Sequence, residues 1–131
     1  MSTKIGLLKS IRGTISQGEK SVGEESGACL YKSDCGLRCS VGMLIPSKKY
    51  SGSMEGHDIG DVEVQQSIPN KYKTNQFWKE YLGLIQSLHD NTVESSCLSF
   101  REQFKAGIKS LVGEGGLPKY CLEGLEENRD E

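Results

Sequence analysis

Cysteine and histidine are the residues of this 131-residue chain whose side chains could do chemistry. Cys29, Cys35 and Cys39 lie close together in the sequence, and His57 is the nearest imidazole that could complete a set of four ligands. Zinc favours four sulfur or nitrogen donors in a tetrahedron. The gaps between these cysteines are five and three residues, whereas a zinc knuckle spaces its pair by about two. We therefore expect no cofactor and keep zinc at these four residues as the alternative.

A cysteine nucleophile is the second kind of chemistry that these residue types allow. It needs a thiolate, a base and a group that orients the base. Cys39, His89 and Asp90 supply those three types if the elements that carry them pack together. The sequence around Cys39 matches no nucleophile signature, so a packed cysteine is the simpler interpretation. We assign no catalytic residue and favour a binding protein over an enzyme, with a thiol- or zinc-dependent module using His57 or His89 as the alternative.

Tyr50, Trp78 and Lys79 are the residues that we assign to a partner-binding surface. Phe77 and Tyr81 fall on the apolar face of their helix and are expected in the core. Trp78 is turned about 100° away from Phe77 and stands next to Lys79. An exposed tryptophan is a favoured interface anchor, although burial in the core also fits this residue.

Three helices are expected to position these side chains. The first begins near Ser2 or Thr3 and stops at Gly18, with an apolar face that comprises Ile5, Leu8, Ile11 and Ile15. The second covers residues 76–89 after a cap at Thr74 or Asn75. The third covers residues 100–112, because Ser99 and Glu102 form a capping box and Gly113 ends the pattern.

One β-hairpin is expected to complete the fold. Two short, apolar-leaning runs flank a glycine-containing turn over residues 28–42, which is the pattern of a tight antiparallel hairpin. Residues 62–67 fit either a strand or a short helix capped by Asp61. The predicted fold class is therefore α+β, with three main helices packed on a small antiparallel hairpin.

Length and charge limit the domain organisation and the class of partner. The chain fits a single compact domain over residues 1–120, followed by an acidic, partly disordered tail over residues 121–131. A net charge of −2 argues against a nucleic-acid binder, because phosphate binding needs a basic face. No apolar run is long enough to span a membrane and no secretory signal is present, so we expect a cytoplasmic protein with reduced thiols.

Residues 29–56 carry a motif that resembles a family of small proteins encoded by tailed bacteriophages and prophages. The matching positions are Cys29, Tyr31, Gly36, Leu37, Cys39, Val41, Gly42, Leu44, Ile45, Pro46, Tyr50, Glu55 and Gly56. The segments 15–22 and 85–90 are also similar, so the likeness spans most of residues 10–112. The chain departs from the family pattern at Cys35, Arg38 and Ser40, where the family tends to have Asp, Lys and Ala.

The resemblance implies a phage or prophage origin and a location in the cytoplasm of the bacterial host. The family has no assigned activity, so it contributes no catalytic residue to this chain. Small phage accessory proteins often act by binding and inhibiting host or defence proteins. A host or defence protein is therefore the partner that the resemblance leads us to expect, with neither a membrane nor nucleic acid as the target.

Overall fold

The structure is a computed structural model that describes residues 2–22, 29–33, 35–92 and 99–126. The described residues form helices α1 (Ser2–Gln17), α2 (Val62–Ser67), α3 (Trp78–Asn91) and α4 (Phe100–Gly113). Short 3-10 helices connect them: η1 (Gly42–Leu44), η2 (Ser47–Lys49), η3 (Gly52–Met54), η4 (Asn70–Tyr72) and η5 (Lys119–Leu125). The three long helices that the sequence predicts are thus all present, with ends shifted by at most two residues.

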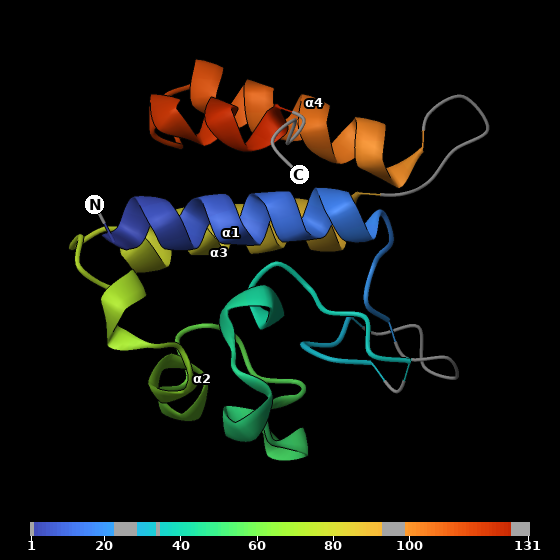
Figure 1. Ribbon diagram of the computed structural model, residues 1–131, viewed down its shortest axis with the longest axis vertical. Coiled ribbons are helices and arrows are strands. Elements are labelled where there is room, and N and C mark those ends of the chain that lie inside the picture. Colours follow the sequence, from blue (N-terminus) through green and yellow to red (C-terminus); the bar gives the residue numbers. More distant parts are fainter. Residues whose placement is uncertain (1, 23–28, 34, 93–98, 127–131) are drawn as a thin grey trace.

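Helix α1 is the central element of the fold. It lies beside α3 and runs in the same direction, while α4 lies along one side of this pair and runs the opposite way (Figure 1). η5 follows α4 and packs on both α1 and α4. The irregular segment that contains η1 to η4 and α2 covers the other side of the pair (Figure 1), where η1 and η4 contact α1. α1 is therefore covered from two sides.

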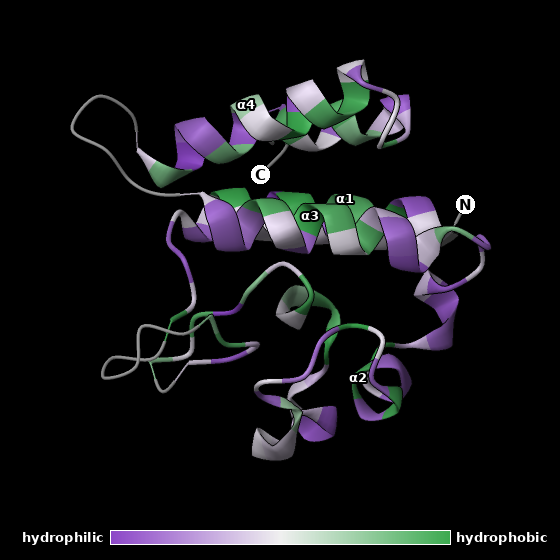
Figure 2. Ribbon diagram, turned by 180° about the vertical axis from the view of Figure 1, so that it is seen from behind, coloured by the Kyte–Doolittle hydropathy of each residue, from purple (hydrophilic) through white to green (hydrophobic). Residues whose placement is uncertain are grey.

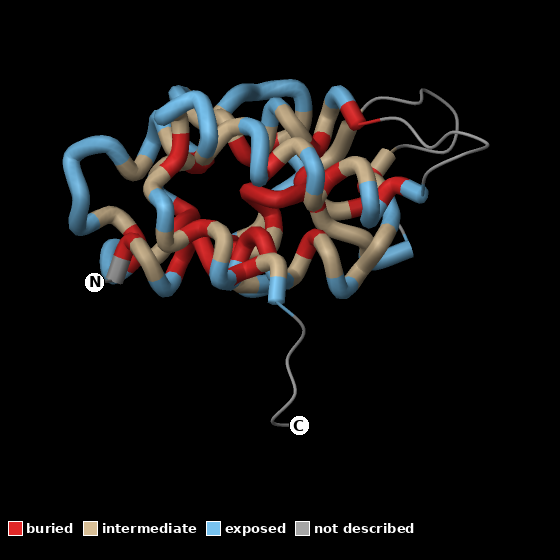
Figure 3. The backbone as a smooth tube through the Cα atoms, turned by 90° about the horizontal axis from the view of Figure 1, so that it is seen from above, coloured by how far each residue is buried: buried red, intermediate tan, exposed pale blue. Residues whose placement is uncertain are grey.

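Hydrophobic residues gather where α1, α3 and α4 face one another (Figure 2), and buried residues run through the middle of the molecule (Figure 3). On α1 the buried set includes polar residues as well: Thr3, Leu7, Leu8, Ser10, Ile11 and Thr14. The Ser10 hydroxyl donates to the carbonyl of Ser40 at 2.7 Å, and the Thr3 hydroxyl donates to that of Tyr72 at 3.2 Å. Ile5, which the sequence pattern places in the core, is 61% exposed.

The ends of the helices follow local capping rules. The Ser99 hydroxyl accepts the N–H of Glu102, and the Glu102 carboxylate accepts the N–H of Ser99, as predicted for a capping box. The predicted cap of α3 at Thr74 or Asn75 is wrong, because the N-cap is Phe77 without a side-chain hydrogen bond, and Asn75 instead accepts the N–H of Phe77 at 2.7 Å in the turn before the helix. Asp61 accepts the N–H of Glu63, so the ambiguous segment 62–67 is a short helix.

The prediction of an α+β fold with an antiparallel hairpin is wrong, because the fold is helical. In the described part of residues 28–42, β-pairing consists of isolated bridges, Lys32 with Arg38 and Val22 with Cys29. The N–H groups of Tyr31 and Lys32 donate to the carboxylate of Glu55, at 2.9 and 3.2 Å, rather than to a second strand. The chain then turns into η1 at Gly42. A tight turn is present, but the ladder that the pattern implied does not form.

The packed part of the chain continues beyond residue 120, where the sequence analysis placed the start of the tail. Cys121 and Gly124 of η5 are buried, and a Cβ on Gly124 would lie 2.8 Å from the Ile11 side chain of α1. Residues 127–131 lie outside the described residues. Among the helices described, none has the length and apolar character that crossing a membrane requires.

Candidate functional site

An open cleft of about 500 Å³ lies between the C-terminal half of α3 and two loops. The first loop contributes residues 29–31, the second contributes residues 56–59, and α3 contributes residues between 83 and 91. The Tyr31 hydroxyl donates to the carbonyl of His57, which joins the two loops. The titratable or thiol side chains that line this α3 cleft are Cys29, Tyr31, Cys39, His57, Asp58 and Asp90.

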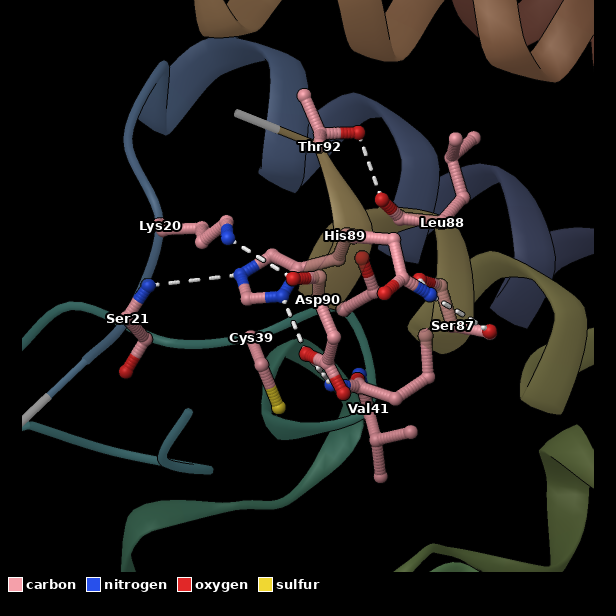
Figure 4. A network of polar contacts seen from close by, with 12 residues as sticks. Lys20, Ser21, Cys39, Val41, Ser87, Leu88, His89, Asp90 and Thr92 are labelled. Atoms are coloured by element: carbon pink, nitrogen blue, oxygen red, sulfur yellow. Dashed lines mark hydrogen bonds and ion pairs between the residues drawn. The ribbon is translucent and has the colours of Figure 1, made fainter. Parts of the chain in front are cut away.

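His89 stands behind the α3 cleft and is completely buried. Its Nε2 lies 3.4 Å from the backbone nitrogen of Ser21, and its Nδ1 lies 2.8 Å from Oδ1 of Asp90 (Figure 4). A backbone N–H only donates, so Nε2 must accept the hydrogen bond from Ser21, and the ring proton is on Nδ1. The imidazole therefore bridges the segment after α1 to the last turn of α3.

Asp90 receives further hydrogen bonds from this network. The Gln86 amide donates to Oδ1 of Asp90 at 2.7 Å, and the amide oxygen of Gln86 accepts the N–H of Val41 at 2.8 Å. Lys20 donates to the backbone carbonyl of Asp90 at 2.8 Å. Three segments that are far apart in the sequence, residues 20–21, 39–41 and the end of α3, are thereby held together (Figure 4).

The cysteines of the α3 cleft keep their protons at neutral pH. Burial raises the pKa of Cys39 to about 12, and its Sγ accepts the N–H of Gly42 at 3.3 Å. Burial, followed by the charge of Asp90 and a hydrogen bond to it, raises the pKa of Cys29. Nucleophilic cysteines have lowered pKa values, so neither thiol has the electrostatic environment of a nucleophile.

Cys29, His89 and Asp90 form a group that could hold a metal ion, because one ligand atom from each lies within 4.8 Å of the others. Sulfur, nitrogen and carboxylate oxygen are donors that zinc accepts. Zinc requires an unprotonated ring nitrogen, whereas Nδ1 carries the proton and Nε2 accepts from Ser21. Metal binding would therefore require the imidazole to give up one of these contacts.

The four ligands predicted from the sequence are only partly brought together. Cys29, Cys39 and His57 line the α3 cleft, but Cys35 is exposed on the turn and is not among its lining residues. His57 forms an exposed ion pair with Asp61 at 3.4 Å. His89 takes the place that was assigned to His57 in the metal group found among the described residues.

The residues assigned to a partner surface lie in two places. Lys79 is exposed on the first turn of α3, and Trp78 is half-buried with Lys73 Nζ 5.6 Å from its ring centroid. Phe77, expected in the core, is 47% exposed, and its ring centroid lies 6.1 Å from that of Tyr81.

Tyr50 lies elsewhere, in the η2–η3 segment. Its hydroxyl donates to Glu55 Oε2 at 2.6 Å, and the ammonium of Lys32 lies 5.6 Å from its ring centroid. Sequence reasoning missed the organising role of Glu55, although this residue belongs to the motif in residues 29–56. Its spacing from Tyr31 and Lys32 gives no local signal of contact, because the chain between them is irregular.

No protein-family model, curated protein or solved structure matches this chain.

Proposed function

We propose that this chain is an accessory protein of a bacteriophage or prophage that acts in the host cytoplasm by binding and inhibiting a host or defence protein. The binding is supported by one observation above all, the aromatic surface at the start of α3. This aromatic surface comprises Phe77 and Lys79, which are exposed, and Trp78 and Tyr81, which are half-buried and pack against the core. The resemblance of residues 29–56 to phage proteins supports the origin and the kind of target.

The aromatic surface has the composition of an interface anchor. Phenylalanine is mostly buried in folded proteins, yet Phe77 exposes nearly half of its surface at the point where α3 begins. Trp78 is already ordered beneath Lys73, so little side-chain entropy would be lost when a partner covers it. Aromatic side chains are enriched at the centres of protein interfaces.

The polar network at the α3 cleft also favours binding over catalysis. Both ring nitrogens of His89 are engaged in hydrogen bonds, and burial keeps the Cys39 thiol protonated. A nucleophile–base pair needs an acceptor nitrogen facing a thiol, whereas the acceptor Nε2 faces a backbone N–H. These groups serve to hold segments of the chain together.

A capture experiment with matched variants tests this proposal. The immobilised protein is incubated with a lysate of the bacterial host, and captured proteins are identified, purified and titrated for binding and for loss of their own activity. The variant Phe77→Ser with Lys79→Glu should weaken binding by about tenfold or more, as expected for an interface anchor. The control Val62→Ser with Lys109→Glu also alters one exposed apolar residue and one exposed lysine, and it should bind as the wild type does.

Three results would contradict the proposal or one of its parts. Capture of no protein above background would remove the binding function. Equal binding by the Phe77 variant and by the control would show that the aromatic surface does not carry the binding. Binding that leaves the activity of the captured protein unchanged would remove inhibition.

A zinc-dependent module is the second candidate function, and it is favoured by the grouping of Cys29, His89 and Asp90. Elemental analysis of the purified protein and titration with zinc test it directly. If zinc binds there, Cys29→Ser should reduce the bound metal while Cys35→Ser should not, and binding should weaken as the pH falls because protons compete for the ligands. A metal-free protein whose melting temperature is unchanged by zinc and by chelator would exclude this candidate.

A further inference from the structure

A second cleft of about 350 Å³ lies between α1, the η1–η2 segment and η4. Its charged lining residues are all cations, Lys9, Arg38 and Lys71, and no carboxylate is among the described residues that line it. Two more exposed lysines, Lys48 and Lys49, follow the lining residue Ser47 in η2. The chain as a whole has a net charge of −2. The basic cleft therefore carries local positive charge although the chain as a whole is negative.

The cations of the basic cleft have no acidic partner within the described part of the chain. The Lys–carboxylate ion pair recorded there joins Lys4 to Glu123, and the other pairs are between His and Asp. Arg38 is held in place by donating from Nη1 to the carbonyls of Gly42 and Ile45, at 2.9 and 2.5 Å, and from Nη2 to the Ser47 hydroxyl at 2.7 Å. Its position is thus fixed by backbone and hydroxyl acceptors.

Arg38 retains hydrogen-bonding capacity after these contacts. A guanidinium has five N–H donors, and three of them are used, so the Nε–H and one Nη2–H have no acceptor among the described residues. Such a pair of donors fits a carboxylate in a bidentate arrangement. Because the guanidinium is already held, little side-chain entropy is lost when the carboxylate binds.

Apolar residues share the lining of the basic cleft with the cations, and this mixture distinguishes the class of ligand. Met43, Ile45, Pro46, Pro69 and Tyr72 contribute to its lining. A nucleic-acid backbone needs a run of cations along a groove on a basic protein, whereas a few cations set among apolar residues fit a protein segment that carries both acidic and apolar side chains. The net negative charge of the chain also disfavours a polyanion.

We propose that the basic cleft binds a segment of the protein partner in which Asp or Glu side chains stand next to apolar ones. This inference rests on the proposed function and adds the chemistry of the partner. Arg38 binds one carboxylate of the segment in a bidentate arrangement. Lys9 and Lys71 attract the neighbouring carboxylates of the same segment. η4 lines the basic cleft and leads through Lys73, which contacts Trp78, into the aromatic surface.

Titration with a synthetic peptide tests the basic cleft without knowledge of the natural partner. The probe is a fluorescein-labelled peptide of Asp, Glu, Leu and Ser, followed by fluorescence anisotropy and by amide chemical shifts of the full chain. Binding should saturate and shift the signals of Lys9, Ser47 and Lys71. The pair Lys9→Glu with Lys71→Glu should weaken the affinity by about tenfold or more, as expected when attracting charges are reversed.

The control pair is Lys109→Glu with Lys119→Glu, which changes the net charge equally at exposed positions outside the basic cleft. It should change the affinity by less than about twofold, because exposed distant charges are screened. Arg38→Lys should also weaken binding, since an ammonium cannot form the bidentate contact. Unfolding midpoints of all variants show whether the fold is intact.

Three results would overturn this inference: no saturable binding of the peptide, equal loss of affinity in both lysine pairs, or tighter binding of inorganic phosphate or of a single-stranded oligonucleotide than of the peptide. The outcomes also separate this inference from the proposed function. Capture of a host protein without peptide binding would reject only the basic cleft. Peptide binding without any captured host protein would reject the proposed function and leave only the ligand chemistry of the basic cleft.

Discussion

The carboxylate of Glu55 organises the irregular chain of residues 29–56. One of its oxygens accepts the N–H of Tyr31, and the other accepts the N–H of Lys32 and the hydroxyl of Tyr50. These donors come from two stretches of irregular chain that have no ladder of their own. A charged acceptor with several donors is worth more than a single neutral hydrogen bond, so Glu55 stabilises the arrangement of these two stretches.

Substitution of this residue should be costly. Glu55→Ala leaves two partly buried N–H groups and a hydroxyl without their acceptor, and we expect the free energy of unfolding to fall by about 2–4 kcal/mol. Glu63→Ala is the matched control, because Glu63 accepts only from the exposed Ser53 hydroxyl among the described residues, and it should cost less than about 1 kcal/mol. Urea denaturation at neutral pH measures both, and equal losses would contradict the assigned role.

At the scale of elements, η1 begins where the chain passes closest to its own earlier segment. A Cβ on Gly42 would lie 2.1 Å from the carbonyl oxygen of Tyr31. The atom in the way belongs to the backbone, so no side-chain rotation relieves the clash. This close approach ends the second arm of the expected hairpin and positions Cys39 and Val41 against the end of α3, where Val41 bonds to Gln86.

Gly42→Ala should therefore destabilise the protein strongly. We expect a loss of about 3 kcal/mol or more, at the upper end of what overpacking costs. Gly52→Ala in η3 is the control, because a Cβ there meets nothing within 4 Å, and its stability should stay within about 0.5 kcal/mol of the wild type. Thermal unfolding of the two variants makes the comparison, and a Gly42→Ala protein as stable as Gly52→Ala would show that the approach is looser than described.

At the scale of the whole molecule, α1 is packed on two sides, and each side contains a buried thiol. Cys39 precedes η1 on one side, and Cys121 lies in η5 on the other. Burial raises the pKa of both thiols to about 12, with the charge of Glu123 adding to the effect at Cys121. The folded state therefore holds two protons that the unfolded chain releases at a lower pH.

This difference makes global stability sensitive to alkaline pH. In the unfolded chain each thiol titrates near about pH 8.5. Above that pH the folded state binds more protons, so the free energy of unfolding should fall by about 1.4 kcal/mol per pH unit for each thiol, until the folded thiols titrate. The stability contributed by the raised pKa values is fully present below about pH 8.5 and is lost as the pH rises towards about 12.

Variants separate the contribution of the thiols to this pH dependence from that of other groups that titrate at alkaline pH. Cys39→Ala and Cys121→Ala should each flatten the decline measured by urea denaturation between pH 8.5 and 10.5, by about 1.4 kcal/mol per pH unit. A decline of equal steepness in the wild type and in both variants would show that the buried thiols do not differ in protonation between the two states.

The sequence by itself determined the local features of this protein. The long helices and the capping box of Ser99 and Glu102 follow from contacts between residues three or four positions apart. Such contacts form within one element, so a pattern in the chain is enough to indicate them. The length of the helices and the presence of a tight turn near Gly36 could be predicted in this way.

Only the tertiary structure decided which faces are buried and which functional groups meet. The hydroxyl-bearing side of α1 is buried because the carbonyls of Ser40 and Tyr72 accept hydrogen bonds from it. The hairpin does not form because the carboxylate of Glu55, from elsewhere in the chain, accepts the N–H groups of Tyr31 and Lys32. The side chains of Cys29, His89 and Asp90 come close together only after distant segments pack. The same holds for Arg38, Lys9 and Lys71, which line one cleft. Periodicity carries no information about such contacts, because they depend on the relative placement of elements and not on the spacing of residues within one.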